Sequence, residues 1–140
     1  MTIPRWFAGV VFLIGLTAAV RATDDPPVLL PQYEQISSAL AADDLPAARN
    51  AAQKFAASAV TLHQADMAAT ARRIAGANDL AGAREAFKAL SAQAIALAHG
   101  AKGYFVVTCP MAQADWLQRT KEIRNPYLGR EMLSCGRIKE

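Results

Sequence analysis

The sequence has few cysteines, no cluster of basic residues and no apolar run long enough to span a bilayer. Only two of its 140 residues are cysteine. The apolar run Trp6–Leu16 has about 11 residues, whereas a membrane-spanning helix needs roughly 20. The absence of a basic cluster argues against binding to nucleic acid or to acidic lipid.

The sequence also lacks the motifs of common enzyme classes. It contains no Gly-rich phosphate loop and no nucleophile elbow. Serine, histidine and acidic residues occur without a recognisable catalytic arrangement, and Asp115, Glu122 and Glu131 are most simply solvated surface charges. We therefore expect a protein that is not an enzyme.

The N-terminus has the pattern of a signal peptide. Arg5 precedes the apolar run, and small residues follow it, with Val20 and Ala22 at the −3 and −1 positions of a cleavage site. We expect residues 1–22 to be removed and the protein to be periplasmic or otherwise exported, without a membrane span. An uncleaved N-terminal anchor is the alternative, because Arg21 lies inside the proposed site.

The chain that remains after this cleavage fits one domain. Removal of 22 residues from 140 leaves 118, which is enough to bury a core. Loss of Arg5 and Arg21 lowers the 15 basic residues to 13, against 12 acidic residues. Residues 23–30 begin with TDDPP and predict a short disordered leader, so the domain is expected over residues 31–140.

Apolar residues repeat at helical spacing from residue 31 to about residue 97. Asp44 and Asp79 are placed to cap the second and fourth helices, and Gly76 and Asn78 to end the third in a left-handed conformation. The spacing predicts an all-α, up-down bundle of about four helices. The expected buried positions are Tyr33, Ile36, Leu40, Ala48, Ala52, Phe55, Ala59, Leu62, Met67, Ala71, Ile74, Leu80, Ala83, Phe87, Leu90, Ala94 and Leu97.

The C-terminal third has a different composition, and we expect an irregular segment packed on the bundle. Tyr104–Thr108 is β-branched and aromatic, which is typical of a buried strand. Residues 114–121 are expected to form a helical turn, and residues 132–138 a short helix or a second strand that pairs with the first. The residues expected to bury against the bundle are Trp116, Tyr127 and Leu133.

Sulfur-containing side chains are concentrated in this segment. They form two short pairs, Cys109-x-Met111 and Met132-x-x-Cys135. Thiolate and thioether are soft donors that suit Cu(I) or Ag(I), so the four residues are candidate metal ligands. The alternative is a Cys109–Cys135 disulfide, favoured by an oxidising compartment, with both methionines as core filling. In either case we expect the two cysteines to lie close together.

The two histidines are weaker candidates. His99 is expected in the last turn of the fourth helix, where a cation interacts well with the helix dipole. It could also reach a metal held by Cys109, about ten residues away in the sequence. His63 is expected at the surface near a helix end.

Several motifs together resemble a bacterial domain of unknown function. The motifs are CPMA at 109–112, ADWLQ at 114–118, IRNPYLG at 123–129, MLSCG at 132–136 and, in the helical part, AR-x-x-F-x-x-LS at 83–91. The resemblance extends from about Tyr33 to Ile138. The domain that it resembles occurs alone behind signal peptides and fused to periplasmic adaptor subunits of copper and silver efflux pumps.

The resemblance implies an exported domain that binds or handles a soft metal ion such as Cu(I) or Ag(I). By motif, Cys109, Met111, Met132 and Cys135 would carry that function, with a protein of a metal-efflux system as a partner. The alternative is a non-catalytic interaction module of a periplasmic efflux or envelope assembly, with Cys109–Cys135 as a structural disulfide.

Overall fold

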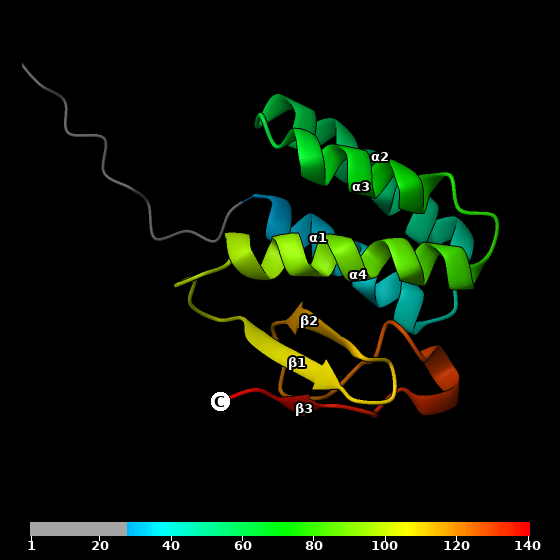
Figure 1. The fold of residues 1–140 in the computed structure, drawn as a ribbon, viewed down its shortest axis with the longest axis vertical. Coiled ribbons are helices and arrows are strands. Elements are labelled where there is room, and N and C mark those ends of the chain that lie inside the picture. Colours follow the sequence, from blue (N-terminus) through cyan, green and yellow to red (C-terminus); the bar gives the residue numbers. More distant parts are fainter. Residues whose placement is uncertain (1–27) are drawn as a thin grey trace, which may run out of the picture.

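The structure, a computed structural model, describes residues 28–140 as four helices followed by a small sheet (Figure 1). The expected signal peptide and the first part of the expected leader lie outside the described residues. The first helix begins two residues before the domain boundary expected at residue 31. Leu29 and Leu30 lie in this helix and are buried, so a leader can extend no further than residue 28.

The helices run α1 (Leu29–Ala41), α2 (Leu45–Thr61), α3 (Ala65–Ala75) and α4 (Leu80–Leu97). Each packs against the next in sequence through a short connection, which is the expected up-down arrangement. Within residues 28–140, none of these helices combines the length and apolar character that crossing a bilayer demands.

Two of the expected helix caps are present. The side chain of Asp44 accepts a hydrogen bond from the Ala47 N–H at 2.9 Å, and that of Asp79 accepts one from the Gly82 N–H at 2.7 Å. The expected left-handed end of α3 is wrong, because Gly76 has a φ of −93°. Left-handed residues instead follow the first two helices, at Asp43 and His63.

The apolar stripes form the core as expected, with three exceptions at helix ends. Tyr33, Phe55 and Phe87 are fully buried. Leu62 is 44% exposed because α2 ends at Thr61, before the stripe does. The other two expected core residues, Leu80 and Leu97, lie at the two ends of α4 and are half-buried.

The segment after α4 forms a three-stranded antiparallel sheet. The strands are β1 (Phe105–Cys109), β2 (Ala114–Gln118) and β3 (Arg137–Ile138), in the order β2-β1-β3. The helical turn expected at residues 114–121 is wrong, because β2 pairs with β1 along all five residues. Residues 132–138 contribute the end of a short 3₁₀ helix, η1 (Gly129–Met132), and then the expected pairing with β1.

The sheet packs against the helices beside α4, with β2 making the main contact (Figure 1). Trp116 and Tyr127 are buried as expected, whereas Leu133 is half-buried and lies outside the main core. Aromatic rings join the two layers. Phe87 stacks on Tyr33 with centroids 5.0 Å apart and contacts Tyr127 at 5.7 Å, and Tyr127 meets Trp116 edge-on at 5.9 Å.

A buried chain of hydroxyl groups also crosses this boundary. The Ser91 Oγ atom lies 2.8 Å from the Tyr33 hydroxyl and 2.9 Å from the Tyr127 hydroxyl. The Tyr33 hydroxyl accepts from the Leu117 N–H, and the Tyr127 hydroxyl donates to the Asp115 carbonyl. Burial raises the pKa of both tyrosines, which keeps their hydroxyls protonated.

Arg84 makes a second connection between the helices and the C-terminal segment. Its guanidinium donates to the backbone carbonyls of Pro126 and Leu40, each at 2.9 Å, and forms an ion pair with Asp43. Asp43 also accepts a hydrogen bond from the Arg130 N–H. One arginine on α4 therefore holds the end of α1 and the loop before η1 together.

Gly129 fits beside this arginine only because it has no side chain. Its φ is +59°, and a Cβ atom would overlap the Asp43 carboxylate and the Arg84 guanidinium. Gly103 has a φ of +85°, and no atom lies within 4 Å of the position that a Cβ would take. A side chain at this position would therefore strain the backbone but would overlap no neighbour.

We therefore expect Gly129→Ala to lower the free energy of unfolding by about 3 kcal/mol, combining left-handed strain with overpacking. Gly103→Ala is the matched control and should cost only about 1–2 kcal/mol. Urea denaturation of both variants measures the difference. Equal losses would contradict the role assigned to the Arg84 contact.

Candidate functional site

The two cysteines meet beside β1, as the sequence predicts. The Sγ atoms of Cys109 and Cys135 lie 3.0 Å apart, and neither is in a disulfide. Cys109 is the last residue of β1, and pairing of Thr108 with Arg137 brings the chain just after Cys135 alongside it. The choice between metal binding and a disulfide stays a prediction.

Gly136 allows the chain to make this approach. Its φ is +147°, and a Cβ atom would lie 2.8 Å from the ring of Trp116 and 3.2 Å from the Thr108 carbonyl oxygen. The first contact is closer than a Cβ atom tolerates, and the second is tight. The glycine after Cys135 is therefore required for the chain to pass over Trp116 and bring the second thiol to the first.

Asn125 holds the segment that carries Cys135. It is fully buried, and its side-chain amide donates to the Cys135 carbonyl at 2.7 Å. Its side-chain oxygen accepts from the N–H groups of Tyr127 and Leu128, and its own N–H donates to the Leu133 carbonyl. The Asn-Pro-Tyr motif thus fixes the position of the second thiol.

The surroundings separate the acidities of the two thiols. Burial raises the pKa of the Cys109 thiol, but its hydrogen bond with Cys135 lowers it. Hydrogen bonds from the backbone N–H groups of Ala112 and Met111 and from the Asn125 side chain lower it further, so its pKa lies below the ordinary value. The same bond to Cys109, together with burial, raises the pKa of the Cys135 thiol.

The other predicted ligands lie at the surface. Met111 is 65% exposed in the turn between β1 and β2, and Met132 is 37% exposed at the end of η1, three residues before Cys135. The expectation that His99 lies in the last turn of α4 is wrong, because the helix ends at Leu97. His99 is exposed before β1, whereas Cys109 ends that strand.

The number of donors limits which ions this site could hold. Within residues 28–140, no group of three or more His, Cys, Asp or Glu side chains is arranged to hold a metal ion. Two thiols remain, with methionines two and three residues away in the sequence. This donor set does not match the four-coordinate N and S sites of structural zinc but is compatible with soft ions that accept few ligands.

Asn125 lies in the IRNPYLG motif at 123–129, but the sequence pattern alone assigns it no role. The Asn-Pro-Tyr order within the resembling motif was the available signal for a specific role. It could not reveal the contacts to Cys135 and Cys109, because those depend on how the loop folds back against β1.

These features define a protein with a four-helix up-down bundle and an appended three-stranded sheet that brings two thiols together. Residues 29–103 match a family described as protein of unknown function (DUF3347), and the chain belongs to this family. The matched residues comprise the four helices and end before β1, so the four candidate sulfur ligands lie outside them. No curated protein and no solved structure matched the chain.

The separated acidities predict how the reduced protein titrates. We expect the pair to lose one proton below the usual thiol pKa and the second above it, because the first thiolate is stabilised by hydrogen bonds and opposes the second. Thiolate ultraviolet absorbance against pH measures both steps. Cys135→Ser should leave a single step, and two thiols that titrate together near the ordinary value would contradict the geometry.

Proposed function

We propose that this is an exported, non-catalytic protein that binds Cu(I) or Ag(I) through sulfur. Cys109 and Cys135 supply two thiolates, and Met111 or Met132 completes the ligand set. The observation that carries the proposal is the 3.0 Å contact between two free thiols.

The chemistry of the donors supports a soft ion as the cargo. A metal binds the thiolate form of cysteine, and the lowered pKa of Cys109 makes that form more accessible at neutral pH. Copper(I) and silver(I) accept soft sulfur ligands. Cys109 is fully buried within the sheet, while Cys135 is half-buried and gives the ion a route from the surface.

Export and an efflux setting form part of the same proposal. The N-terminal pattern favours a periplasmic location, and the C-terminal motifs resemble those of domains fused to adaptors of copper and silver efflux pumps. A metal-efflux protein is therefore the proposed partner. In this role the protein would receive or hold the ion and would catalyse no reaction.

A second candidate is an interaction module in which the cysteines form a structural disulfide. The same close contact favours this alternative, because an oxidising compartment promotes the bond. The cysteines are 26 residues apart, and closing such a loop would stabilise the fold by roughly 3 kcal/mol in the chain-entropy model. Oxidation would also remove the thiolates that the metal needs.

Export can be tested directly. Expression of the full chain in a Gram-negative bacterium should yield a periplasmic protein whose intact mass is that of a chain that begins at Thr23. Ala22→Leu should block this processing because the −1 position requires a small residue. An unprocessed protein retained in the cytoplasm would contradict the proposed location.

The metal proposal predicts a specific order of affinities. In competition with a Cu(I) chelator, the reduced protein should bind one ion. Removing a residue that only hydrogen-bonds to a metal ligand lowers metal affinity by about 10- to 100-fold. Cys109→Ser removes a ligand itself, so it should lower the affinity by more than about 100-fold. Met132→Leu should cost on the order of tenfold, as a thioether is one of several donors.

Met67→Leu is the matched control for the methionine substitution. Met67 is buried in α3, away from the sheet, and its replacement should leave the affinity unchanged. Equal affinity in the wild type and Cys109→Ser would overturn the site. Absence of binding in the reduced wild type would leave the interaction module as the better account.

A further inference from the structure

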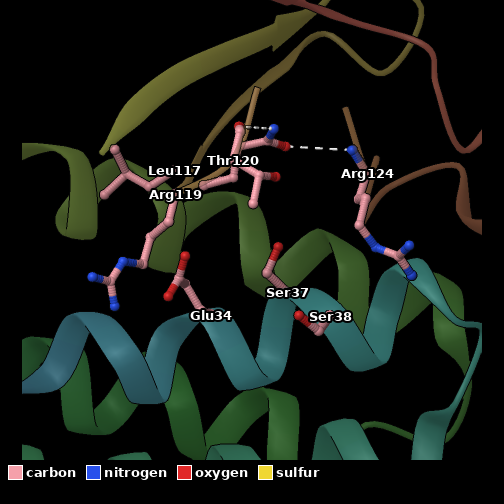
Figure 2. A pocket seen from close by; sticks show the side chains of 8 residues that line it. Glu34, Ser37, Ser38, Leu117, Arg119, Thr120 and Arg124 are labelled. Atoms are coloured by element: carbon pink, nitrogen blue, oxygen red, sulfur yellow. Dashed lines mark hydrogen bonds between the residues drawn. The ribbon is translucent and has the colours of Figure 1, made fainter. Parts of the chain in front are cut away.

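A cavity of about 310 Å³ lies between α1 and the loop that follows β2 (Figure 2). Ser37 and Ser38 line it from α1, and Arg119 and Arg124 line it from the loop. Small-molecule pockets begin at about this volume. Gln118 pairs with Phe105, whereas Cys109 pairs with Ala114, so Gln118 and Cys109 lie at opposite ends of the β1–β2 pair. The cavity beside Gln118 is therefore separate from the sulfur site.

Gln118 gives the loop its shape. Its side chain is 9% exposed, and its amide donates to the carbonyls of Thr120 and Glu122 at 2.7 and 2.8 Å. Its side-chain oxygen accepts from the Trp116 ring N–H and the Arg124 N–H. The backbone is therefore fixed from within, and the cavity is formed before any ligand arrives.

The charges in the cavity are unequally compensated. Burial raises the pKa of Glu34 above its ordinary value, although the positive charge of the nearby Arg119 acts in the opposite direction, so one end of the cavity holds a carboxylate beside a guanidinium. Arg119 also lies over the Tyr104 ring, 5.5 Å from its centroid. Within residues 28–140 neither Arg119 nor Arg124 has an ion-pair partner within 4.0 Å, but Arg119 acts on the charge of Glu34, whereas Arg124 at the other end does not.

The hydroxyl groups complete a binding surface beside Arg124. Figure 2 shows Ser37 and Ser38 on α1, between the Glu34–Arg119 end and Arg124. Ser37 is 7% exposed, which is consistent with a polar group reached through the cavity. An uncompensated guanidinium with adjacent hydroxyl donors matches the planar oxygens of a carboxylate.

We infer that this cavity binds a small carboxylate, with Arg124 as its principal partner and Ser37 and Ser38 as hydrogen-bond donors. The positive charge of Arg124 and the nearby negative charge of Glu34 together favour a carboxylate over the more highly charged phosphate. The carboxylate could belong to a free organic acid or to a peptide C-terminus. The inference does not depend on metal binding at the sulfur site.

Amide NMR of the protein purified with its native N-terminus tests the inference and separates the two sources. Succinate, trialanine, trialanine amide and phosphate are titrated in turn. Shifts confined to residues 37–38 and 118–124 with succinate alone indicate a free acid. Shifts with trialanine but not its amide indicate a peptide C-terminus. No response to either carboxylate, equal binding of trialanine and its amide, or tighter binding of phosphate overturns the inference.

Substitutions then test the assigned roles against the carboxylate that binds. Arg124→Gln should lower the affinity by at least roughly tenfold, because it removes a charged hydrogen-bonding partner. Glu34→Gln should raise the affinity by removing a like charge. Arg73→Gln is the matched control, since it removes the same charge from an exposed position in the last turn of α3. Equal losses in Arg73→Gln and Arg124→Gln, or none in the latter, overturn the assignment.

Discussion

The packing of the sheet on the helices depends on the buried hydroxyl chain through Ser91. Polar groups removed from water must find partners inside the protein, and here each partner comes from a different element. Ser91 lies on α4, Tyr33 on α1 and Tyr127 in the loop before η1. A shift of the sheet relative to the helices would leave hydroxyl groups unpaired in the core. The aromatic contacts of Phe87 set the spacing, and the hydroxyl chain sets the alignment.

The position of the sulfur pair follows from this alignment. Tyr127 anchors one end of the loop to the core, and Arg84 holds the neighbouring Pro126 carbonyl. Asn125 then connects the anchored loop to the backbone of Cys135. Each of these residues belongs to a motif that carries the family resemblance, yet its contacts are structural. Within the motifs, the chemistry that we propose is confined to the sulfur side chains.

Local patterns were sufficient to predict the helices. The periodic apolar residues and the caps at Asp44 and Asp79 act within a few residues, so the sequence displays them directly. The stripe through Leu62 extended beyond the helix because periodicity alone does not mark where hydrogen bonding stops. Strand β2 escaped prediction because Trp116 and Leu117 are adjacent and do not alternate with polar residues. Its strand conformation depends on pairing with β1.

The sulfur site and the cavity beside Arg124 also differ in how far the sequence predicts them. The closeness of Cys109 and Cys135 could be anticipated from their mirrored place beside methionines, whereas the support from Asn125 is visible only after the loop has folded. The cavity beside Arg124 gave no sequence signal. Its walls come from α1 and from a loop about eighty residues later, and a single exposed arginine has no distinguishing pattern.

Gly136 packs against the ring of Trp116, and this contact gives the protein an internal optical reporter. Trp116 is the only tryptophan after residue 22, and it is fully buried beside the chain that carries Cys135. Emission from a buried indole responds to nearby groups that accept energy or electrons. Tryptophan emission from residues 28–140 therefore comes from a ring beside the sulfur-bearing chain, and its intensity can follow events at the two thiols without an added label.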